Sequence, residues 1–144
     1  MSVVPSAAPE KPYVFISYAR GDNYDRHLAR QLDEALRIRK IEVFRDQSSL
    51  EIGDVWPDKL QNALARATHF VVFLSAEARQ SRWVNYEIDA AVARPREELR
   101  IVGIRRSTSA EFPQLANIEV RLCEYGQELE TVFRVFGMPW EEDG

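Results

Sequence analysis

The sequence predicts an α/β fold of three layers, in which helices cover both faces of a five-stranded parallel sheet. Short apolar runs alternate about five times with segments whose apolar residues recur at helical spacing, and this alternation is typical of parallel strands joined by crossover helices. Three of the runs are apolar throughout, and the other two alternate apolar with polar residues. The first pattern is typical of strands buried on both faces, and the second of strands with one exposed face.

The first half of the chain contains two predicted strands and two predicted helices. A polar loop at 19–23 ends the first strand, and a longer polar loop at 46–55 ends the second. Pro57 suits the first turn of the second helix, where its missing N–H is not needed. The predicted elements are a buried strand at 13–18, an amphipathic helix at about 24–39, an edge strand at 41–45, and a helix with the face Leu60, Leu64 and Ala67.

The second half continues the pattern with three strands and two helices. The helix after the third strand is expected to end at Ala93–Arg94, because Pro95 disfavours helical backbone in the residue before it. Gly137 and Pro139 are expected to end the last helix, and the loop 105–116 to be the least structured internal segment. The predicted elements are buried strands at 70–74 and 99–104, an edge strand at 118–122, a helix beginning near Ser81, and a helix with the face Leu129, Val132, Phe133 and Phe136.

Strand character also predicts the order of the strands. The second and fifth strands have the alternating pattern of edges, and the order 2-1-3-4-5 places them there. In this order the winding reverses between the first and third strands, and ligands bind in the crevice at their carboxyl ends. Tyr18 and Arg20 follow the first strand, and Trp83 and Glu87 lie on the helix after the third. We therefore expect these two segments to meet at one crevice.

Trp83 and Glu87 are the most suggestive pair in the chain. They are four residues apart, so they lie on one face of their helix. Ile88, Ala91 and Val92 form a separate apolar stripe that can pack on the sheet. We expect the pair to lie off the core face, where a ring beside a carboxylate suits a ligand that contains a ring. The alternative is a solvated glutamate beside an aromatic residue that covers apolar surface.

The composition argues against several classes of function. The net charge of −4 disfavours a nucleic-acid partner, because proteins that bind nucleic acids usually carry a basic excess. The single cysteine, Cys123, favours a reducing cytoplasm. With His27 and His69 as the only histidines, no closed zinc site is expected. The sequence contains no Gly-rich phosphate loop, no nucleophile elbow and no apolar run of membrane-spanning length.

The chain is predicted to form one domain with short flanking segments. Residues 1–11 are rich in Ala, Ser and Pro and are expected to be a disordered lead-in. The domain is expected to span 12–140, with 141–144 as a tail. The N-terminus lacks the charged start and apolar middle of a signal peptide, so a cytoplasmic location is expected.

Five segments resemble motifs of the TIR domain family. YVFISY at 13–18 is similar to the family's first strand, and FRD at 44–46 with LEIG at 50–53 is similar to its second strand and following loop. FVVFLS at 70–75 followed by WVNYEI at 83–88 resembles the segment in which a Trp precedes a Glu by four residues. The order and spacing of the motifs carry the resemblance, which covers nearly the whole chain. The family's fold is a flavodoxin-like sandwich with the strand order predicted above.

The resemblance implies a catalytic activity. Some members of the family are scaffolds that signal by self-association, and others cleave NAD at the bond between nicotinamide and ribose. The cleaving members carry a glutamate four residues after a Trp, and Trp83 and Glu87 stand at these positions. The resemblance thus implies that Glu87 is the catalytic carboxylate. It also implies that Tyr18, Arg20 and Trp83 line the NAD pocket and that Trp56 flanks the nicotinamide.

A single carboxylate suits this reaction. Nicotinamide leaves as a neutral pyridine, so no general acid is required, unlike ordinary glycoside cleavage with its two carboxylates. The site has to orient the ribose and place negative charge near the developing oxocarbenium ion. NAD is then the substrate, and no separate cofactor or metal is expected. Attack by water gives ADP-ribose, attack by an atom of the adenine or ribose gives a cyclic isomer, and the sequence leaves both open.

The resemblance also implies partners. Homotypic self-association through the loop region 46–55 is expected to activate the enzyme in bacterial defence or NAD depletion, and a regulatory domain outside this chain is possible. One alternative is a non-catalytic TIR–TIR interaction module that uses the same loop. Another is a pathogen protein that depletes host NAD or blocks host TIR assembly. Receptor-type adaptors frequently lack the glutamate, so the presence of Glu87 favours the enzyme.

Overall fold

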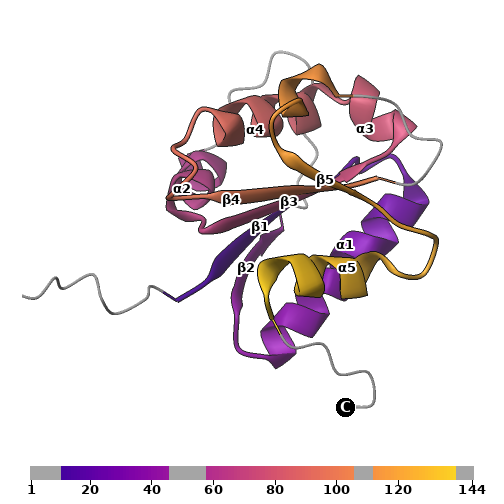
Figure 1. The fold of residues 1–144 in the computed structure, drawn as a ribbon, viewed down its shortest axis with the longest axis horizontal. Helices are drawn as coiled ribbons and strands as arrows, with labels where there is room; N and C mark the ends of the chain where they lie inside the picture. Colours follow the sequence, from indigo (N-terminus) through magenta and orange to yellow (C-terminus); the bar gives the residue numbers. More distant parts are fainter. Residues whose placement is uncertain (1–10, 46–57, 106–111, 139–144) are drawn as a thin grey trace, which may run out of the picture.

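The sheet has the predicted architecture. A computed structural model describes residues 11–45, 58–105 and 112–138. Five parallel strands pair in the order β2-β1-β3-β4-β5, with β2 and β5 at the edges (Figure 1). The elements are β1 (Tyr13–Ser17), α1 (Asn23–Ile38), β2 (Glu42–Arg45), α2 (Asp58–Arg66), β3 (His69–Leu74), α3 (Ala76–Gln80), α4 (Arg82–Val92), β4 (Arg100–Arg105), η2 (Pro113–Leu115), β5 (Glu119–Leu122) and α5 (Glu128–Phe136).

Two short elements were not predicted, the helix α3 and the single 3-10 turn η2 inside the loop 105–116. Two serines explain why separate helices follow β3. The Ser75 hydroxyl accepts a hydrogen bond from the Ala78 N–H at 3.0 Å and begins α3. The Ser81 hydroxyl accepts one from the Val84 N–H at 3.1 Å and begins α4. Each serine provides a partner for an N–H that a helix start leaves unpaired, so each starts a helix.

The helices form one layer on each side of the sheet (Figure 1). α2, α3 and α4 cover one face, and α1 and α5 cover the other. Successive side chains of a strand point to opposite faces. Val14 and Ile16 of β1 therefore enter the core beside α1 and α5, whereas Phe15 enters the core beside α2 and α4. The central strands are buried on both faces, as their continuous apolar runs predict.

A row of three aromatic rings crosses the sheet beneath α2 and α4. Phe15 of β1 is in register with Phe44 of β2 and with Phe70 of β3. Its ring stacks with that of Phe44 at 5.2 Å and with that of Phe70 at 5.5 Å between centroids. Aromatic pairs at these distances add to the stability that burial provides. The row thus joins the three strands on one side of the sheet.

The carboxyl end of β2 is tied to α1 by charged side chains. The Arg45 Nε donates to Asp33 Oδ2 at 2.8 Å, and Arg37 pairs with Asp33 Oδ1. The Arg37 guanidinium also donates to the Val43 carbonyl at 3.1 Å. Asp33 is buried, so losing either arginine would leave its charge poorly compensated. This cluster holds the end of β2 in place beside β1.

Some predictions concern residues outside the described ranges. They concern the lead-in 1–11 apart from Lys11, the segment 46–57 with its loop, Trp56 and Pro57, residues 106–111 of the loop 105–116, and the segment 139–144 with Pro139, the end of the domain and the tail. The domain boundaries accordingly stay predictions. Among the helices of the described part of the chain, none is both long enough and apolar enough to cross a membrane.

His69 gives the fold a testable pH dependence. Its ring meets Phe136 edge-on at 4.5 Å between centroids, and its Nδ1 lies 2.8 Å from Thr68 Oγ1. Burial, and secondarily the positive charge of Arg100, lowers the pKa of His69 below its ordinary value of 6.5. Between the two pKa values the unfolded chain binds more protons than the folded one. Stability is therefore greatest above the ordinary pKa and falls as the pH falls towards the folded pKa.

We expect the free energy of unfolding in urea to decrease from about pH 7 to about pH 5, and to decrease less in His69→Gln. The control is His27→Gln, which removes the other histidine, an exposed residue of α1, and should keep the wild-type dependence. The same pH dependence in all three proteins would contradict the role assigned to His69.

Candidate active site

The carboxyl ends of β1 and β3 lie side by side at the point where the winding of the sheet reverses. Ser17, the last residue of β1, is in register with Val72 of β3. Ser75 directly follows β3, and α4 contacts both strands. The structure therefore brings together the segments that were predicted to form the crevice.

Glu87 is a buried carboxylate at the end of β1. The residue is 3% exposed and comes from α4. The Ser17 hydroxyl, also buried, donates a hydrogen bond of 2.6 Å to Glu87 Oε1. A short hydroxyl–oxygen distance is typical of a hydrogen bond to a charged acceptor. A strand and a helix that are far apart in sequence thus join in one polar pair inside an apolar interface.

The prediction that Glu87 lies off the core face is wrong. The core-facing stripe of α4 has the spacing i, i+3, i+4, i+7 and consists of Val84, Glu87, Ile88 and Ala91. A periodicity analysis places Glu among polar residues, which normally lie on the solvent face. Here the hydroxyl of Ser17 supplies a hydrogen-bond donor under the helix, so the carboxylate occupies a core-facing position.

Trp83 lies one turn before Glu87 on α4 and stays half-buried. Its side chain packs against the core beside α2 and α4. Its ring centroid is 5.7 Å from that of Tyr86, with the two planes tilted by 36°. Tyr86 is largely exposed. The two rings form an aromatic pair that extends from the edge of the core to the surface, on the helix that carries the buried carboxylate.

A second buried carboxylate joins the first turn of α1 to the residue that follows β3. Asp25, in the first turn of α1, is buried and accepts a hydrogen bond of 2.5 Å from the Ser75 hydroxyl. Ser75 also begins α3 through its bond to Ala78. Asp22 begins α1 by accepting from the Asp25 N–H at 3.0 Å. The loop after β1 and the loop after β3 are thereby held at a fixed separation.

Tyr18 and Arg20 pair with each other, but Tyr18 lies on the other face of the sheet from Glu87. The Tyr18 side chain is buried in the core beside α1 and α5. The Arg20 guanidinium is half-buried and lies 5.8 Å from the centre of the Tyr18 ring. Strand alternation explains this, because Ser17 and Tyr18 are neighbours and point in opposite directions. The predicted contacts of Tyr18, Arg20, Trp83 and Trp56 with NAD stay predictions.

Three residues near the end of β1 were not predicted as site residues: Ser17, Asp25 and Ser75. Each had a signal. Ser17 is a hydroxyl in a strand that is otherwise apolar, and Ser75 stands between a strand and a helix, where capping serines occur. Asp25 follows Asp22 by three residues at a helix start, a spacing typical of capping pairs. Within the described ranges, no group of three or more His, Cys, Asp or Glu side chains is arranged to hold a metal ion.

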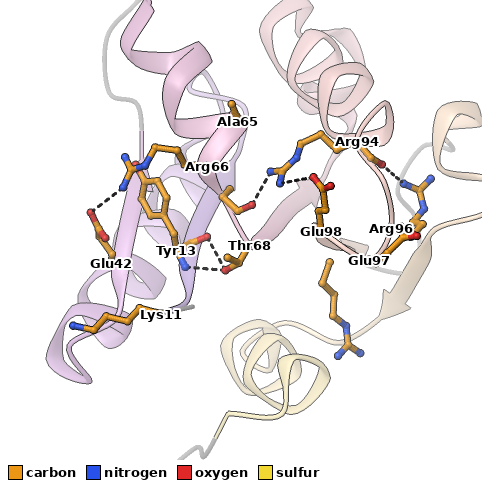
Figure 2. A pocket seen from close by; sticks show the side chains of 12 residues that line it. Lys11, Tyr13, Glu42, Ala65, Arg66, Thr68, Arg94, Arg96, Glu97 and Glu98 are labelled. Carbon is orange, nitrogen blue, oxygen red and sulfur yellow. Dashed lines mark hydrogen bonds and ion pairs between the residues drawn. The ribbon is translucent and has the colours of Figure 1, made fainter. Parts of the chain in front are cut away.

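A wide hollow of about 1190 Å³ lies at the amino ends of the strands, at the opposite end of the sheet from Glu87 (Figure 2). Its arginines have structural roles. Arg94 donates to the carbonyls of Leu64 and Ala67 at 2.9 and 2.6 Å and so closes the end of α2. Arg66 lies over the Tyr13 ring at 4.6 Å and pairs with Glu42 at 3.8 Å. These contacts occupy the guanidinium groups within the fold, so we assign no ligand to the hollow.

The chain is similar to several known proteins. The 2' cyclic ADP-D-ribose synthase BtTIR of Bacteroides thetaiotaomicron is 38% identical over 87 residues, which are 60% of this chain and 30% of that protein. The synthase AbTIR of Acinetobacter baumannii is 33% identical over 93 residues, 65% of this chain and 34% of that protein. The NAD(+) hydrolase TcpA of Theionarchaea archaeon is 28% identical over 107 residues, 71% of this chain and 32% of that protein. The chain thus spans about a third of the length of these curated relatives.

Among solved structures, the TIR domains of the activated Roq1 resistosome superpose with a TM-score of 0.55 at 23% identity, over 88% of this chain and 71% of that chain. At this identity the likeness concerns the fold. A model of the TIR domain family matches residues 14–132, which include all of β1 except Tyr13, together with β3, α4 and the Ser17–Glu87 pair. With the motifs, the strand order and this match in agreement, the chain belongs to the TIR domain family.

Proposed function

We propose that this TIR domain cleaves NAD at the bond between nicotinamide and ribose, with Glu87 as the catalytic carboxylate. The observation that carries the proposal is the buried carboxylate of Glu87 at the end of β1, where the winding of the sheet reverses. Relatives that are named 2' cyclic ADP-D-ribose synthase and NAD(+) hydrolase support it.

Burying the Glu87 carboxylate costs free energy that an apolar residue at the same position would not cost. Its helix places Val84, Ile88 and Ala91 on the same stripe, so an apolar residue would pack there without loss of hydration. Buried Asp33 is paired with two arginines, whereas Glu87 lies where the winding of the sheet reverses, and buried ionisable groups in such places are often functional. This favours catalysis over a purely structural role.

The proposed reaction divides the work among few residues. The Glu87 carboxylate orients the ribose hydroxyls and stabilises the positive charge that develops as nicotinamide leaves. Trp83 and Trp56 offer apolar faces to the rings, and Arg20 meets the pyrophosphate. Water then gives ADP-ribose, or an atom of the same molecule gives a cyclic product.

Self-association is part of the proposal. The loop 46–55 follows β2, and the carboxyl end of β2 pairs with that of β1, which carries the crevice. In this proposal a second copy contacts the loop and completes the active species. Activity is expected to rise more than linearly with protein concentration, because the active species contains more than one copy.

The test is incubation of the purified chain with NAD at high and low protein concentration, followed by chromatography of the products. We expect nicotinamide to be released, together with ADP-ribose or a cyclic ADP-ribose, and light scattering to detect larger species at the high concentration. Absence of nicotinamide at every concentration would contradict the proposal for this chain and favour a non-catalytic interaction module. A specific activity that does not change with protein concentration would contradict the proposal that self-association activates the enzyme.

A further inference from the structure

We propose that Ser17 is a positioning residue, whose hydroxyl holds the Glu87 carboxylate in one orientation for the reaction. The inference rests on the proposed cleavage of NAD, and it adds a residue that sequence comparison with catalytic motifs did not select. Its basis is the buried hydrogen bond of 2.6 Å from Ser17 Oγ to Glu87 Oε1.

The place of Ser17 in β1 directs its hydroxyl towards α4. Val14 and Ile16 point to the core beside α1 and α5, and Phe15 points to the other core. Ser17 follows Phe15 by two positions, so it points to the same face. It is also the last residue of the strand, at the edge where the crevice lies. The strand therefore determines that the hydroxyl points towards α4 and that it lies at the carboxyl end of β1.

Apolar residues around Ser17 and Glu87 strengthen the hydrogen bond between them. Val72 of β3 is in register with Ser17, and Val84 and Ile88 flank Glu87 on its helix. All three are buried and apolar. In surroundings of this kind a hydrogen bond is stronger than in water, and an alternative rotamer of a carboxylate finds fewer donors. The hydroxyl of Ser17 therefore contributes to keeping Glu87 in one rotamer.

The fold alone does not require the pair. Replacing both partners of a buried hydrogen bond by apolar groups is often nearly neutral for stability, whereas removing one partner is not. A serine and a glutamate that meet at the crevice, instead of two apolar residues, are therefore better explained by the use of the carboxylate. The difference between a positioning role and a structural role lies in the reaction rate.

The experiment is a double-mutant cycle with Ser17→Ala, Glu87→Gln and the double variant, measured as steady-state cleavage of NAD and as urea unfolding. We expect Ser17→Ala to lower kcat by about 10- to 100-fold, the range of one hydrogen bond to a charged group, with a smaller change in KM. In the Glu87→Gln background the same change should have little further effect, because both act on one group. Ser17→Thr keeps the hydroxyl and should recover most of the turnover.

The matched control is Ser81→Ala, which removes the serine that begins α4 and has no role in the proposed reaction. It should lower stability while leaving kcat near the wild-type value. If Ser17→Ala retains wild-type kcat while Glu87→Gln is inactive, the positioning role is wrong and the proposed function stands. If Ser17→Ala and Ser81→Ala reduce kcat only in proportion to lost folded protein, the role of Ser17 is structural. If wild type itself releases no nicotinamide, the proposed function fails and the positioning role fails with it.

Discussion

Glu87→Gln is expected to lower the cleavage of NAD by about 10²- to 10³-fold while leaving the fold intact. Glutamine has nearly the same shape and keeps an oxygen that can accept the hydrogen bond from Ser17. It lacks the negative charge that stabilises the developing oxocarbenium ion. Removing one such electrostatic contribution typically lowers turnover by about 10²- to 10³-fold. The measurement is nicotinamide release per folded protein, with circular dichroism and a melting curve to establish the fold.

The melting temperature of Glu87→Gln distinguishes a catalytic role of Glu87 from a structural one. Because a buried carboxylate is costly, a neutral amide in its place should leave the melting temperature equal to that of wild type or raise it. Asp89→Asn on the same helix is the matched control, since Asp89 is exposed and the change also removes one charge. It should retain wild-type turnover. Equal turnover in Glu87→Gln and wild type would contradict the catalytic role.

Phe15→Ala is expected to cause the largest loss of stability. The ring is fully buried and stacks with Phe44 and Phe70 on the two neighbouring strands. Its removal therefore leaves a cavity where the three strands are in contact. Such truncations cost about 3–5 kcal/mol, a large share of the roughly 5–15 kcal/mol that stabilise a typical domain. The measurement is the free energy of unfolding in urea, from the midpoint and the slope of the transition.

Phe15→Leu is the companion variant. It keeps most of the volume but loses the stacking, so its cost should stay below about 1.5 kcal/mol. A loss below about 1 kcal/mol in Phe15→Ala would mean that the neighbouring rings close the cavity, and would contradict the view that this row joins the strands.

Much of the fold followed from patterns that are local in the chain. Continuous apolar runs identified the central strands and alternating runs identified β2 and β5 as edges, as the observed order 2-1-3-4-5 requires. The left-handed backbone of Gly137, with φ of 73°, ends α5 where the sequence predicted. The short helix α3 was missed because the residue before it, Ser75, is typical of the end of a strand motif, while its hydroxyl acts as a helix cap.

The site was predictable only in part. Trp83 and Glu87 were selected by their spacing and by resemblance, and the crevice by strand order. The burial of Glu87 was not predicted, because periodicity assigns faces from polarity and contains no information about a donor on another element. The position of Tyr18 on the opposite face follows from alternation, but the motif YVFISY alone gives Ser17 and Tyr18 equal weight.

The sequence by itself determined the fold class, the strand order and the helix that carries the candidate carboxylate, because these depend on hydrophobic periodicity and on short motifs. Only the tertiary structure decided that Glu87 faces inward, that Ser17 is its hydrogen-bond donor, and that Asp25 and Ser75 join the first turn of α1 to the residue that follows β3. Each of these is a contact between elements that are at least 50 residues apart in the chain. The free energy of such a contact depends on burial and on a partner that no local pattern contains.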